Sequence, residues 1–460
     1  MTRVDGREGA IVTALLALGL LAEPAPSRAQ DGAPEAYAIT GATVHTVSGG
    51  TIENATVVLR DGRILAVGPD APVPPGAEVI DATGKHVYPG MIDAFSRLGL
   101  TEIGAVSATN DAEELGDFNI HLSAYAAIHP ASEHIPVARA NGITHTLAAP
   151  GGGGGFGGGG DGGIPGQATL IHLDGWTVEE MAIEPSAAMV IEWPTIRTRS
   201  FNFQTFSQEE RSFTEAKEEY DEAVGRLEEW MIAAKHYAQA MDAGSERVER
   251  DLQLEHLARV LNGGLPVIVI ANDRRGIESA IEFSDRHGLR MILAGGREAR
   301  EMKETLAEKG IPVILGPTQT VPEDRDDPYD DPNTLPGELH AAGVEIAFAT
   351  FNSSDSRTLP YEVANAVPFG LSKDAAIEAI TLGAARILGV DDRLGSVEVG
   401  KVGNLIVTDG DPLEIQTRIE HVFIKGVPVD LSNKHRELWE KYRNRPQKGK
   451  PVTVSSGATP

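Results

Sequence analysis

Short apolar runs alternate with charged, helix-like stretches through the centre of the chain. Two of the helix-like stretches span residues 278–288 and 297–310. The strand-like runs are rich in Val, Ile and Leu and lie at residues 142–150, 168–173, 187–193, 265–272, 290–296, 311–317 and 344–351. Apolar strands that alternate with amphipathic helices predict βα units and a parallel sheet. Their number, over roughly 300 residues, favours a (β/α)8 TIM-like barrel over an open doubly wound sheet.

Two further segments, 36–86 and 395–431, have a different pattern. Val-, Ile- and Thr-rich runs are broken there by Gly-Gly, Asp-Gly and Ala-Thr-Gly, which are strand and turn signals. We therefore predict an α/β protein in which a small β-sandwich domain, built from both chain ends, accompanies a barrel over residues 87–394.

Three other segments depart from this alternation. Residues 207–262 are charged and helix-prone, with bulky apolar residues at helical spacing, and predict two barrel-side helices. The Pro- and Asp-rich stretch 322–332 predicts a loop that forms a lid over the barrel mouth. Its carboxylates also suit Ca²⁺, although the spacing is not that of an EF-hand. The tail 432–460, basic and then rich in Ser, Gly and Pro, is expected to fray.

The first 29 residues have the pattern of an export signal. Arg3 and Arg7 precede the uncharged run 10–22, and Ser27-Arg28-Ala29 supplies small residues before Gln30. This order predicts a secretory signal peptide over 1–29 and a periplasmic or secreted protein. The apolar run is too short to cross a bilayer, so no membrane span is expected.

Composition narrows the range of partners. The chain carries 67 Asp and Glu against 40 Lys and Arg, a net charge of −27, which argues against nucleic acid as a main partner. It contains no cysteine, which excludes disulfides, thiolate metal sites and cysteine nucleophiles. Glycine is abundant, and 11 of the 51 Gly lie in the run 151–163. No Gly-Lys-Ser/Thr follows that run, so we interpret it as a loop and not as a phosphate-binding motif.

Several segments together resemble the amidohydrolase superfamily, in particular its imidazolonepropionase-like members. The resemblance extends over roughly residues 36–431. The segments that carry it are VIDATGKHVYPGMIDA (79–94), the stretch 162–181, LPVIVIANDRRGIESAIEFSDRHGLRMILAGGREA (265–299) and the stretch 381–413. It implies a barrel enzyme that hydrolyses C–N bonds with one or two divalent metals, such as Zn²⁺, in the barrel mouth.

The resemblance also implies His and carboxylate ligands at the strand ends, and most of those positions hold other residues here. The two His of strand one correspond to Phe95 and Arg97. The His of strand five corresponds to Ile270, with Asn272 two residues later, and the His of strand six to Gly295. At strand eight, Phe351 and Asn352 follow Thr350 where the family has Asp. Phe, Ile and Gly offer no side-chain donor to a metal.

Glu192 is the one matching ligand, at the strand-four position where the family places a metal-bridging carboxylate. We hypothesise that Glu192 pairs with Arg97 in place of the lost metal charge. Other candidate groups are five histidines and one acid, for which we favour structural or surface roles over metal binding: His121, His129, His134, His145, His172 and Asp355.

Three functions compete. The first is an active amidohydrolase with a rebuilt metal site. The second, which we favour, is a barrel that does not hydrolyse its ligand: it binds a small molecule in a partly apolar pocket or serves as a subunit of an active homologous amidohydrolase. The third is metal-free hydrolysis with Glu192 as general base. We expect no resident cofactor unless the family's metal chemistry persists, and we expect a homo-oligomer.

Overall fold

The computed structural model describes residues 34–151, 162–202, 207–244, 248–321 and 328–445. The predicted signal peptide, most of the glycine run and half of the predicted lid lie outside these ranges.

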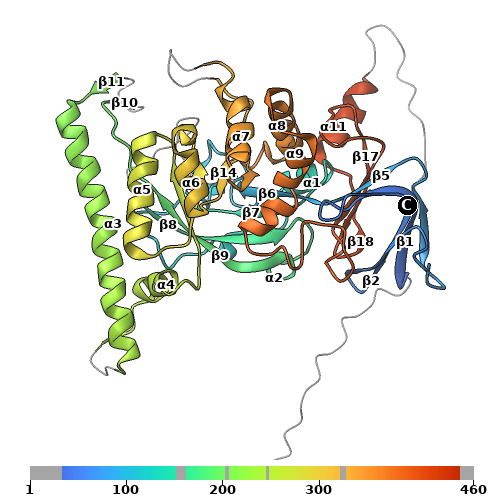
Figure 1. The fold of residues 1–460 in the computed structure, drawn as a ribbon, viewed down its shortest axis with the longest axis horizontal. Helices are drawn as coiled ribbons and strands as arrows, with labels where there is room; N and C mark the ends of the chain where they lie inside the picture. Colours follow the sequence, from blue (N-terminus) through green and yellow to red (C-terminus); the bar gives the residue numbers. More distant parts are fainter. Residues whose placement is uncertain (1–33, 152–161, 203–206, 245–247, 322–327, 446–460) are drawn as a thin grey trace, which may run out of the picture.

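The central sheet is a nearly closed barrel, which confirms the predicted TIM-like architecture (Figure 1). In spatial order its strands are β15 (Ile346–Phe348), β14 (Val313–Leu315), β13 (Met291–Gly295), β12 (Val267–Ala271), β9 (Ala182–Glu192), β8 (Gly163–His172), β7 (Ile143–Ala148) and β6 (Met91–Ser96). The two ends of this order meet just past the last residue of β15, where the Phe351 N–H donates to the Phe95 carbonyl over 2.9 Å.

One barrel strand departs from strict βα alternation. β8 runs antiparallel to both β7 and β9, whereas the remaining neighbours are parallel. Parallel neighbours need a crossover of a dozen or more residues, usually with a helix, whereas antiparallel neighbours can be joined by a short return. The connection from β8 to β9 contains only the one-turn helix α2 (Val178–Met181), which fits an antiparallel return.

A second eight-stranded sheet combines both ends of the described chain, as predicted. Its strands are β1 (Ala36–His45), β2 (Thr51–Arg60), β3 (Arg63–Gly68), β4 (Glu78–Asp81), β5 (His86–Pro89), β16 (Leu405–Thr408), β17 (Ile419–Ile424) and β18 (Val427–Pro428). They enclose a core of their own, in which Ile39, Val57 and Phe423 are fully buried. The domain limits at residues 86 and 395 remain a prediction.

Residues 207–262 contain two helices, as predicted. The long α3 (Phe213–Asp242) begins at a capping box, in which Ser212 and Glu215 satisfy each other's backbone N–H groups. Its buried residues recur every three or four positions and pack on the barrel side. The shorter α4 (Leu252–Leu261) follows, and a small hairpin of β10 (Arg199–Asn202) and β11 (Ser207–Glu210) precedes α3.

The remaining barrel helices surround the sheet and are mostly short (Figure 1). They are α1 (His134–Arg139), α5 (Arg274–His287), α6 (Lys303–Lys309), α7 (Asp331–Ala341), α8 (Leu359–Ala366), α9 (Lys373–Ala379) and α10 (Leu382–Ile387). Within the described ranges, no helix has the length and apolar composition needed to cross a membrane.

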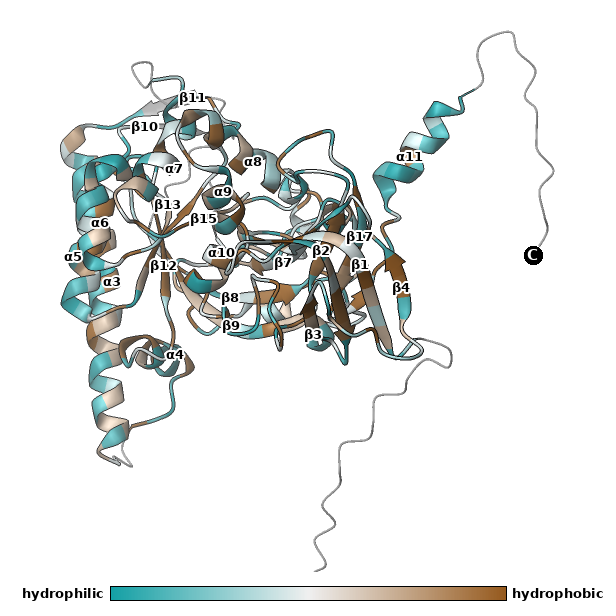
Figure 2. Cartoon of the chain, turned by 45° about the vertical axis from the view of Figure 1, so that its right-hand side comes forward, coloured by the Kyte–Doolittle hydropathy of each residue, from teal (hydrophilic) through white to brown (hydrophobic). Residues whose placement is uncertain are grey.

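The prediction of a fraying tail was wrong for its first part. Residues Lys434–Arg443 form the helix α11, which projects from the second sheet (Figure 2). The Asn433 side chain accepts the Arg436 N–H over 3.1 Å and so caps the first turn. A side-chain oxygen at this position stabilises a helix start, and it explains why this polar segment is ordered.

Candidate ligand site at the barrel mouth

The interior of the barrel is apolar up to its mouth, the carboxyl ends of the parallel strands. Ala188, Val190, Ile268, Ile270, Ile292 and Ala294 belong to one buried cluster that fills the interior. Ile270 pairs in register with Glu192 on one side and with Ala294 on the other. Because side chains alternate along a strand, Glu192 faces inward with Ala188 and Val190. The top layer of the interior therefore combines one carboxylate with two apolar side chains.

Two stacked phenylalanines close this layer beside β6. The rings of Phe95 and Phe351 are 4.8 Å apart between centroids and 28° from parallel, and Phe95 is 1% exposed. Phe351 has a φ of +52°, a conformation that bulky residues rarely adopt. Its backbone hydrogen bond to Phe95 holds that conformation in place. Positions 95 and 351 therefore carry aromatic rings, which offer no side-chain donor to a metal.

Arg97 does not pair with Glu192 as hypothesised. Its guanidinium forms an ion pair with Glu113 (Nη2 to Oε1, 3.0 Å) and donates two hydrogen bonds to the Gly151 carbonyl (2.8 and 3.2 Å). Gly151 also lies against Glu192, since a Cβ on this glycine would be 2.7 Å from Glu192 Oε1. The arginine therefore holds the start of the glycine run next to the carboxylate without contacting the carboxylate itself.

Gly295 has no room for a side chain. Its φ is +87°, and a Cβ there would lie 2.4 Å from Asn272 Oδ1. The Asn272 amide therefore occupies the space that a longer residue at position 295 would need. Asn352 has a local structural role, because its Oδ1 accepts from the N–H and hydroxyl of Ser354 (2.9 and 3.0 Å) in the loop after β15.

A buried acid beneath the mouth was missed at the sequence level. Asp93 on β6 is fully buried and accepts hydrogen bonds from the Thr350 N–H (3.1 Å) and the Thr350 hydroxyl (2.6 Å). Burial raises the pKa of Asp93 to about 7, although the bonds from Thr350 act in the opposite direction. This pair ties the first strand of the barrel to the segment that follows the last. The sequence did contain a sign of this pair: Asp93 and Thr350 are polar residues within otherwise apolar strand-like runs.

The two strand histidines lie at the other end of the barrel. His145 and His172 are cross-strand partners on β7 and β8, and Asn404 donates its amide hydrogens to both, at 3.1 Å for His172 Nδ1. Burial lowers the pKa of His145 to about 3 and that of His172 well below its ordinary value. Both rings are therefore neutral hydrogen-bond partners at the junction with the second sheet.

The other candidates from the sequence lie outside the mouth layer. His121 and His129 are exposed, and His134 Nε2 lies 2.9 Å from the Glu102 carbonyl. Asp355 precedes a short 3-10 turn and caps it without a side-chain bond. Among the described residues, no group of three or more His, Asp or Glu could hold a metal ion.

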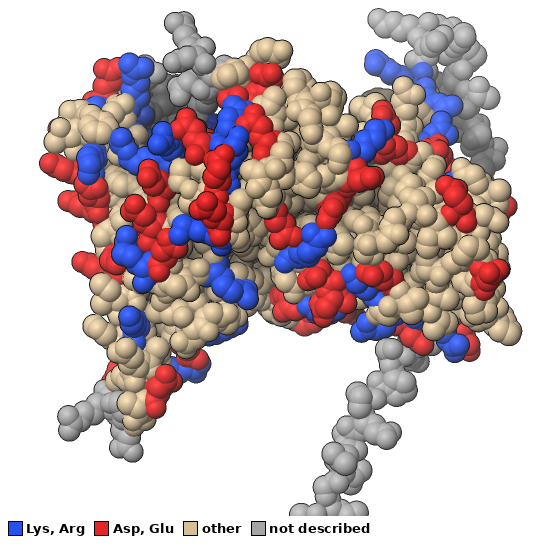
Figure 3. Space-filling view, viewed as in Figure 1, with Lys and Arg blue, Asp and Glu red and all other residues tan. Residues whose placement is uncertain are grey.

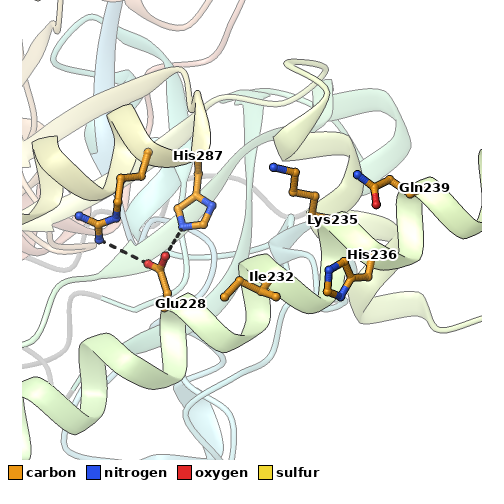
Figure 4. Close-up of a pocket in the computed structure, with 7 residues that line it drawn as sticks. Glu228, Ile232, Lys235, His236, Gln239 and His287 are labelled. Atoms are coloured by element: carbon orange, nitrogen blue, oxygen red, sulfur yellow. Dashed lines mark hydrogen bonds and ion pairs between the residues drawn. The ribbon is translucent and has the colours of Figure 1, made fainter.

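Two described cavities lie away from the mouth. One, of about 440 Å³, opens between α3 and α5, where Glu228 pairs with both Arg286 (3.4 Å) and His287 (3.1 Å) (Figure 4). The other, of about 220 Å³, is lined by residues around the start of β15 and by α9. Neither cavity includes Glu192 or Asn272.

The fold, a nearly closed α/β barrel with a second sheet from both chain ends, is the architecture of the amidohydrolases. Residues 234–430 match the model of the amidohydrolase family. The crystal structure of an amidohydrolase from Thermotoga maritima superposes with a TM-score of 0.72 at 26% identity, over 86% of this chain and 99% of that chain. In sequence and in fold, the chain is therefore similar to the amidohydrolases.

Two known proteins are similar in sequence to most of this chain. An imidazolonepropionase of Mesorhizobium japonicum is 25% identical over 401 residues, which cover 80% of this chain and 90% of that protein. Amidohydrolase tasK of Hapsidospora irregularis is 24% identical over 88% of this chain. The chain spans only 42% of the length of tasK. The relationship to imidazolonepropionases is therefore distant.

Proposed function

We propose that this amidohydrolase-like barrel binds a small molecule at its mouth and lacks the metal-dependent hydrolysis of its superfamily. The observation that carries the proposal is the top layer of the barrel interior, where Glu192 is flanked in register by Ile270 and Ala294. A catalytic metal needs several converging nitrogen or oxygen donors, and one carboxylate does not supply them.

The residues at the mouth do not fit the divalent metal that the fold family implies. Phe95 and Phe351 present stacked rings, Gly295 has no room for a longer side chain, and Arg97 carries a positive charge. Asn272 contributes an amide, which is a weak ligand for Zn²⁺ beside the usual His, Cys and carboxylate donors. We therefore derive no hydrolytic step that depends on a bound metal.

The same side chains suit a ligand that has one apolar part and one part that forms hydrogen bonds. An apolar surface with a few convergent polar groups is the usual composition of a small-molecule site. Phe351, which is partly exposed beside the buried Phe95, would contact a planar or apolar part of the ligand. Glu192 would accept hydrogen bonds from the ligand, and the Asn272 amide has both donor and acceptor atoms.

The direct test of this proposal combines chelation with a substitution at Glu192. A bound metal would stabilise the folded chain, so its removal by EDTA would lower the melting temperature. We expect no shift for this protein, and a clear shift for an imidazolonepropionase that is treated in parallel as a control. We also expect no hydrolysis of cyclic amides or dipeptides.

Two results would contradict the proposal. Loss of stability on chelation, regained on adding Zn²⁺, would indicate an active enzyme with a rebuilt metal site. Hydrolysis that resists EDTA but disappears in Glu192→Gln would instead support Glu192 as a general base. Stimulation of a homologous amidohydrolase by the wild-type chain, and equally by Glu192→Gln, would favour a role as its partner subunit.

A further inference from the structure

The helix α11 carries an aromatic stripe along one side. His435, Leu438, Trp439 and Tyr442 stand at i, i+3, i+4 and i+7, the spacing that places side chains on one face of a helix. Trp439 is 58% exposed and Tyr442 62%, and no residue of the helix is buried. Among the described residues, no other element therefore covers this stripe.

Basic residues follow both borders of the stripe. Because an α-helix turns once in about 3.6 residues, Lys434 and Lys441 lie on one border, and Arg436 and Arg443 lie on the other. The two members of each pair are at i and i+7, so both borders are basic over the length of the helix. Figure 3 shows basic side chains gathered on α11, at the upper right of the molecule.

Two contacts show that these basic side chains border the aromatic rings. Lys441 Nζ lies 5.6 Å from the centroid of the Tyr442 ring, and the guanidinium carbon of Arg443 lies 4.7 Å from the centroid of the Trp439 ring. A cation at this distance from an aromatic ring is attracted by its electrons. The stripe is therefore bounded by positive charge on both sides.

The acidic residues of α11 lie on the side opposite the stripe. Glu437, Glu440 and Asn444 stand at i, i+3 and i+7, half a turn away from the aromatic residues. Glu437 also forms an ion pair with Lys434 (Oε2 to Nζ, 3.6 Å). Residues 434–445 contain five Lys or Arg against two Glu, a net charge of +3. The positive charge thus lies beside the stripe and the negative charge behind it.

This arrangement matches the surface of an anionic phospholipid bilayer, which is flat, negative at its headgroups and apolar beneath them. Trp and Tyr concentrate at the boundary between headgroups and acyl chains, and Lys and Arg side chains extend from that boundary to the headgroups. A helix with an aromatic face and basic residues beside it lies in the plane of this boundary. We propose that α11 docks the protein on an anionic phospholipid surface, with Leu438, Trp439 and Tyr442 in the boundary and both basic borders on the headgroups.

The body of the protein holds the base of α11. Arg139 Nη2 donates to the Asp430 carbonyl over 3.1 Å, and the buried Asn433 donates to the Leu431 carbonyl over 3.1 Å. The Asn433 side chain also caps the helix, which projects from the second sheet (Figure 2). Binding through α11 would therefore hold the whole folded chain at the membrane surface.

The net charge of −27 limits the strength of this contact but does not prevent it. At physiological ionic strength, exposed charges separated by more than about 8 Å are largely screened. The helix has 10 residues, is about 15 Å long and projects from the sheet, so its own positive charge dominates at a surface that it touches. A single short helix supports reversible binding and not permanent anchoring. We therefore expect weak, salt-sensitive association.

Hydrogen exchange of the full chain, measured by mass spectrometry, tests the proposal. It reports on residues 434–443 alone, whereas vesicle co-sedimentation would also detect lipid binding by the apolar run 10–22. The probe is a vesicle of phosphatidylcholine with about one-quarter phosphatidylglycerol, and pure phosphatidylcholine vesicles are the neutral control. We expect the anionic vesicles to slow exchange in residues 434–443 at low salt, much more than the neutral vesicles do, and we expect this protection to disappear as salt rises.

Substitution of the aromatic residues tests the stripe. Trp439→Ala/Tyr442→Ala should raise the lipid concentration for half-maximal protection by about tenfold or more, because it removes most of the apolar area that enters the boundary. Trp176→Ala is the matched control and should have no effect, because Trp176 is 92% exposed and lies outside α11. No residue of α11 is buried, so the double substitution leaves the packed core unchanged.

Substitution of the basic residues tests the borders. Arg436→Gln/Arg443→Gln should also raise the half-maximal lipid concentration by about tenfold or more, because each basic residue near an anionic surface contributes to binding. Arg275→Gln/Arg290→Gln removes the same two charges from exposed positions outside α11 and should leave the protection unchanged. Equal effects of the two pairs would contradict the proposal, because they would show that only the net charge of the chain matters.

The remaining outcomes are equally decisive. Unchanged exchange in residues 434–443 with anionic vesicles at low salt would overturn the proposal, as would equal protection by anionic and neutral vesicles. Sedimentation velocity without lipid tests a different occupant of the stripe. A concentration-dependent dimer that is lost in Trp439→Ala/Tyr442→Ala would assign the stripe to a second copy of the chain and would overturn the assignment to lipid.

Discussion

At the scale of single residues, the mouth of the barrel is defined by side chains that occupy space where the superfamily resemblance implies metal ligands. The Asn272 amide fills the space beside Gly295, and the rings of Phe95 and Phe351 stack on each other. Because of these contacts, the residue at one position limits which side chain fits at its neighbour. A longer side chain at position 295 would therefore have to displace the Asn272 amide.

Gly295→Ala tests this coupling. The substitution combines strain from a φ of +87° with a Cβ placed 2.4 Å from Asn272 Oδ1. We expect a loss of about 2–4 kcal/mol in the free energy of unfolding by urea, because strain and overpacking add. Gly310→Ala is the matched control, since Gly310 has a φ of +62° and open space around it. An equal cost at both positions would refute the steric part of the argument.

The buried histidine pair predicts a dependence of stability on pH. His145 titrates near pH 3 in the folded chain, because burial disfavours its charged form, and near 6.5 when unfolded. The unfolded state therefore binds the extra proton between these values. The stabilisation is complete above about pH 6.5 and is lost as the pH falls towards 3, by at most ~1.4 kcal/mol per pH unit.

Urea unfolding of wild type and His145→Gln at pH 7.5 and pH 5 measures this contribution. We expect the wild type to lose about 2 kcal/mol more than the variant between these two pH values, because glutamine does not titrate. Identical pH dependence in the two proteins would mean that His145 is already accessible to protons in the folded state.

At the scale of secondary-structure elements, the sequence pattern predicted the barrel strands and both helices of residues 207–262. It could not predict that β8 is antiparallel, because apolar periodicity gives the presence of a strand but not its direction. The sequence also contained a signal for the helix α11, which was overlooked because the tail is basic in composition. That signal was Asn433 as a cap, followed by the spacing of Leu438, Trp439 and Tyr442.

The site was less predictable than the fold. The sequence identified Glu192, Asn272 and Arg97, whose positions follow from strand ends. The partners of Arg97 could not be foreseen, because Glu113 and Gly151 come from loops. The Asp93–Thr350 pair joins residues 257 positions apart, a contact that local pattern does not encode.

That pair closes the barrel, and Thr350→Val tests its contribution. The substitution removes the hydroxyl that donates to Asp93 Oδ2 over 2.6 Å and leaves a buried oxygen without this donor. We expect a loss of about 1–3 kcal/mol in the free energy of unfolding. Thr350→Ser keeps the hydroxyl and should cost much less. Equal effects of Val and Ser would show that the lost methyl packing, and not the hydrogen bond, explains the change.

At the scale of the whole molecule, two features of the sequence matter: the net charge and the predicted export signal. A net charge of −27 disfavours non-specific association between copies of the chain. The predicted signal peptide would place the mature chain outside the cytoplasm. The proposed export is independent of the chemistry at the mouth.

Export has its own test. When the chain is produced in a Gram-negative host, we expect the periplasmic fraction to contain a protein that begins at Gln30, because Ser27-Arg28-Ala29 is the expected cleavage motif. Mass spectrometry of the intact protein identifies its first residue. Arg3→Glu/Arg7→Glu should reduce export by weakening the basic start of the signal. Full-length protein confined to the cytoplasm would contradict the prediction.

The most direct test of the central claim is the metal content of the purified protein. The full chain, produced in medium supplemented with Zn²⁺, Fe²⁺ and Mn²⁺ and purified without chelators, is analysed by inductively coupled plasma mass spectrometry. Because a built site retains its metal through purification, whereas incidental binding does not, we expect far less than one metal ion per chain. About one equivalent of Zn, Fe or Mn per chain, lost on substitution of Glu192 by Gln, would contradict the account.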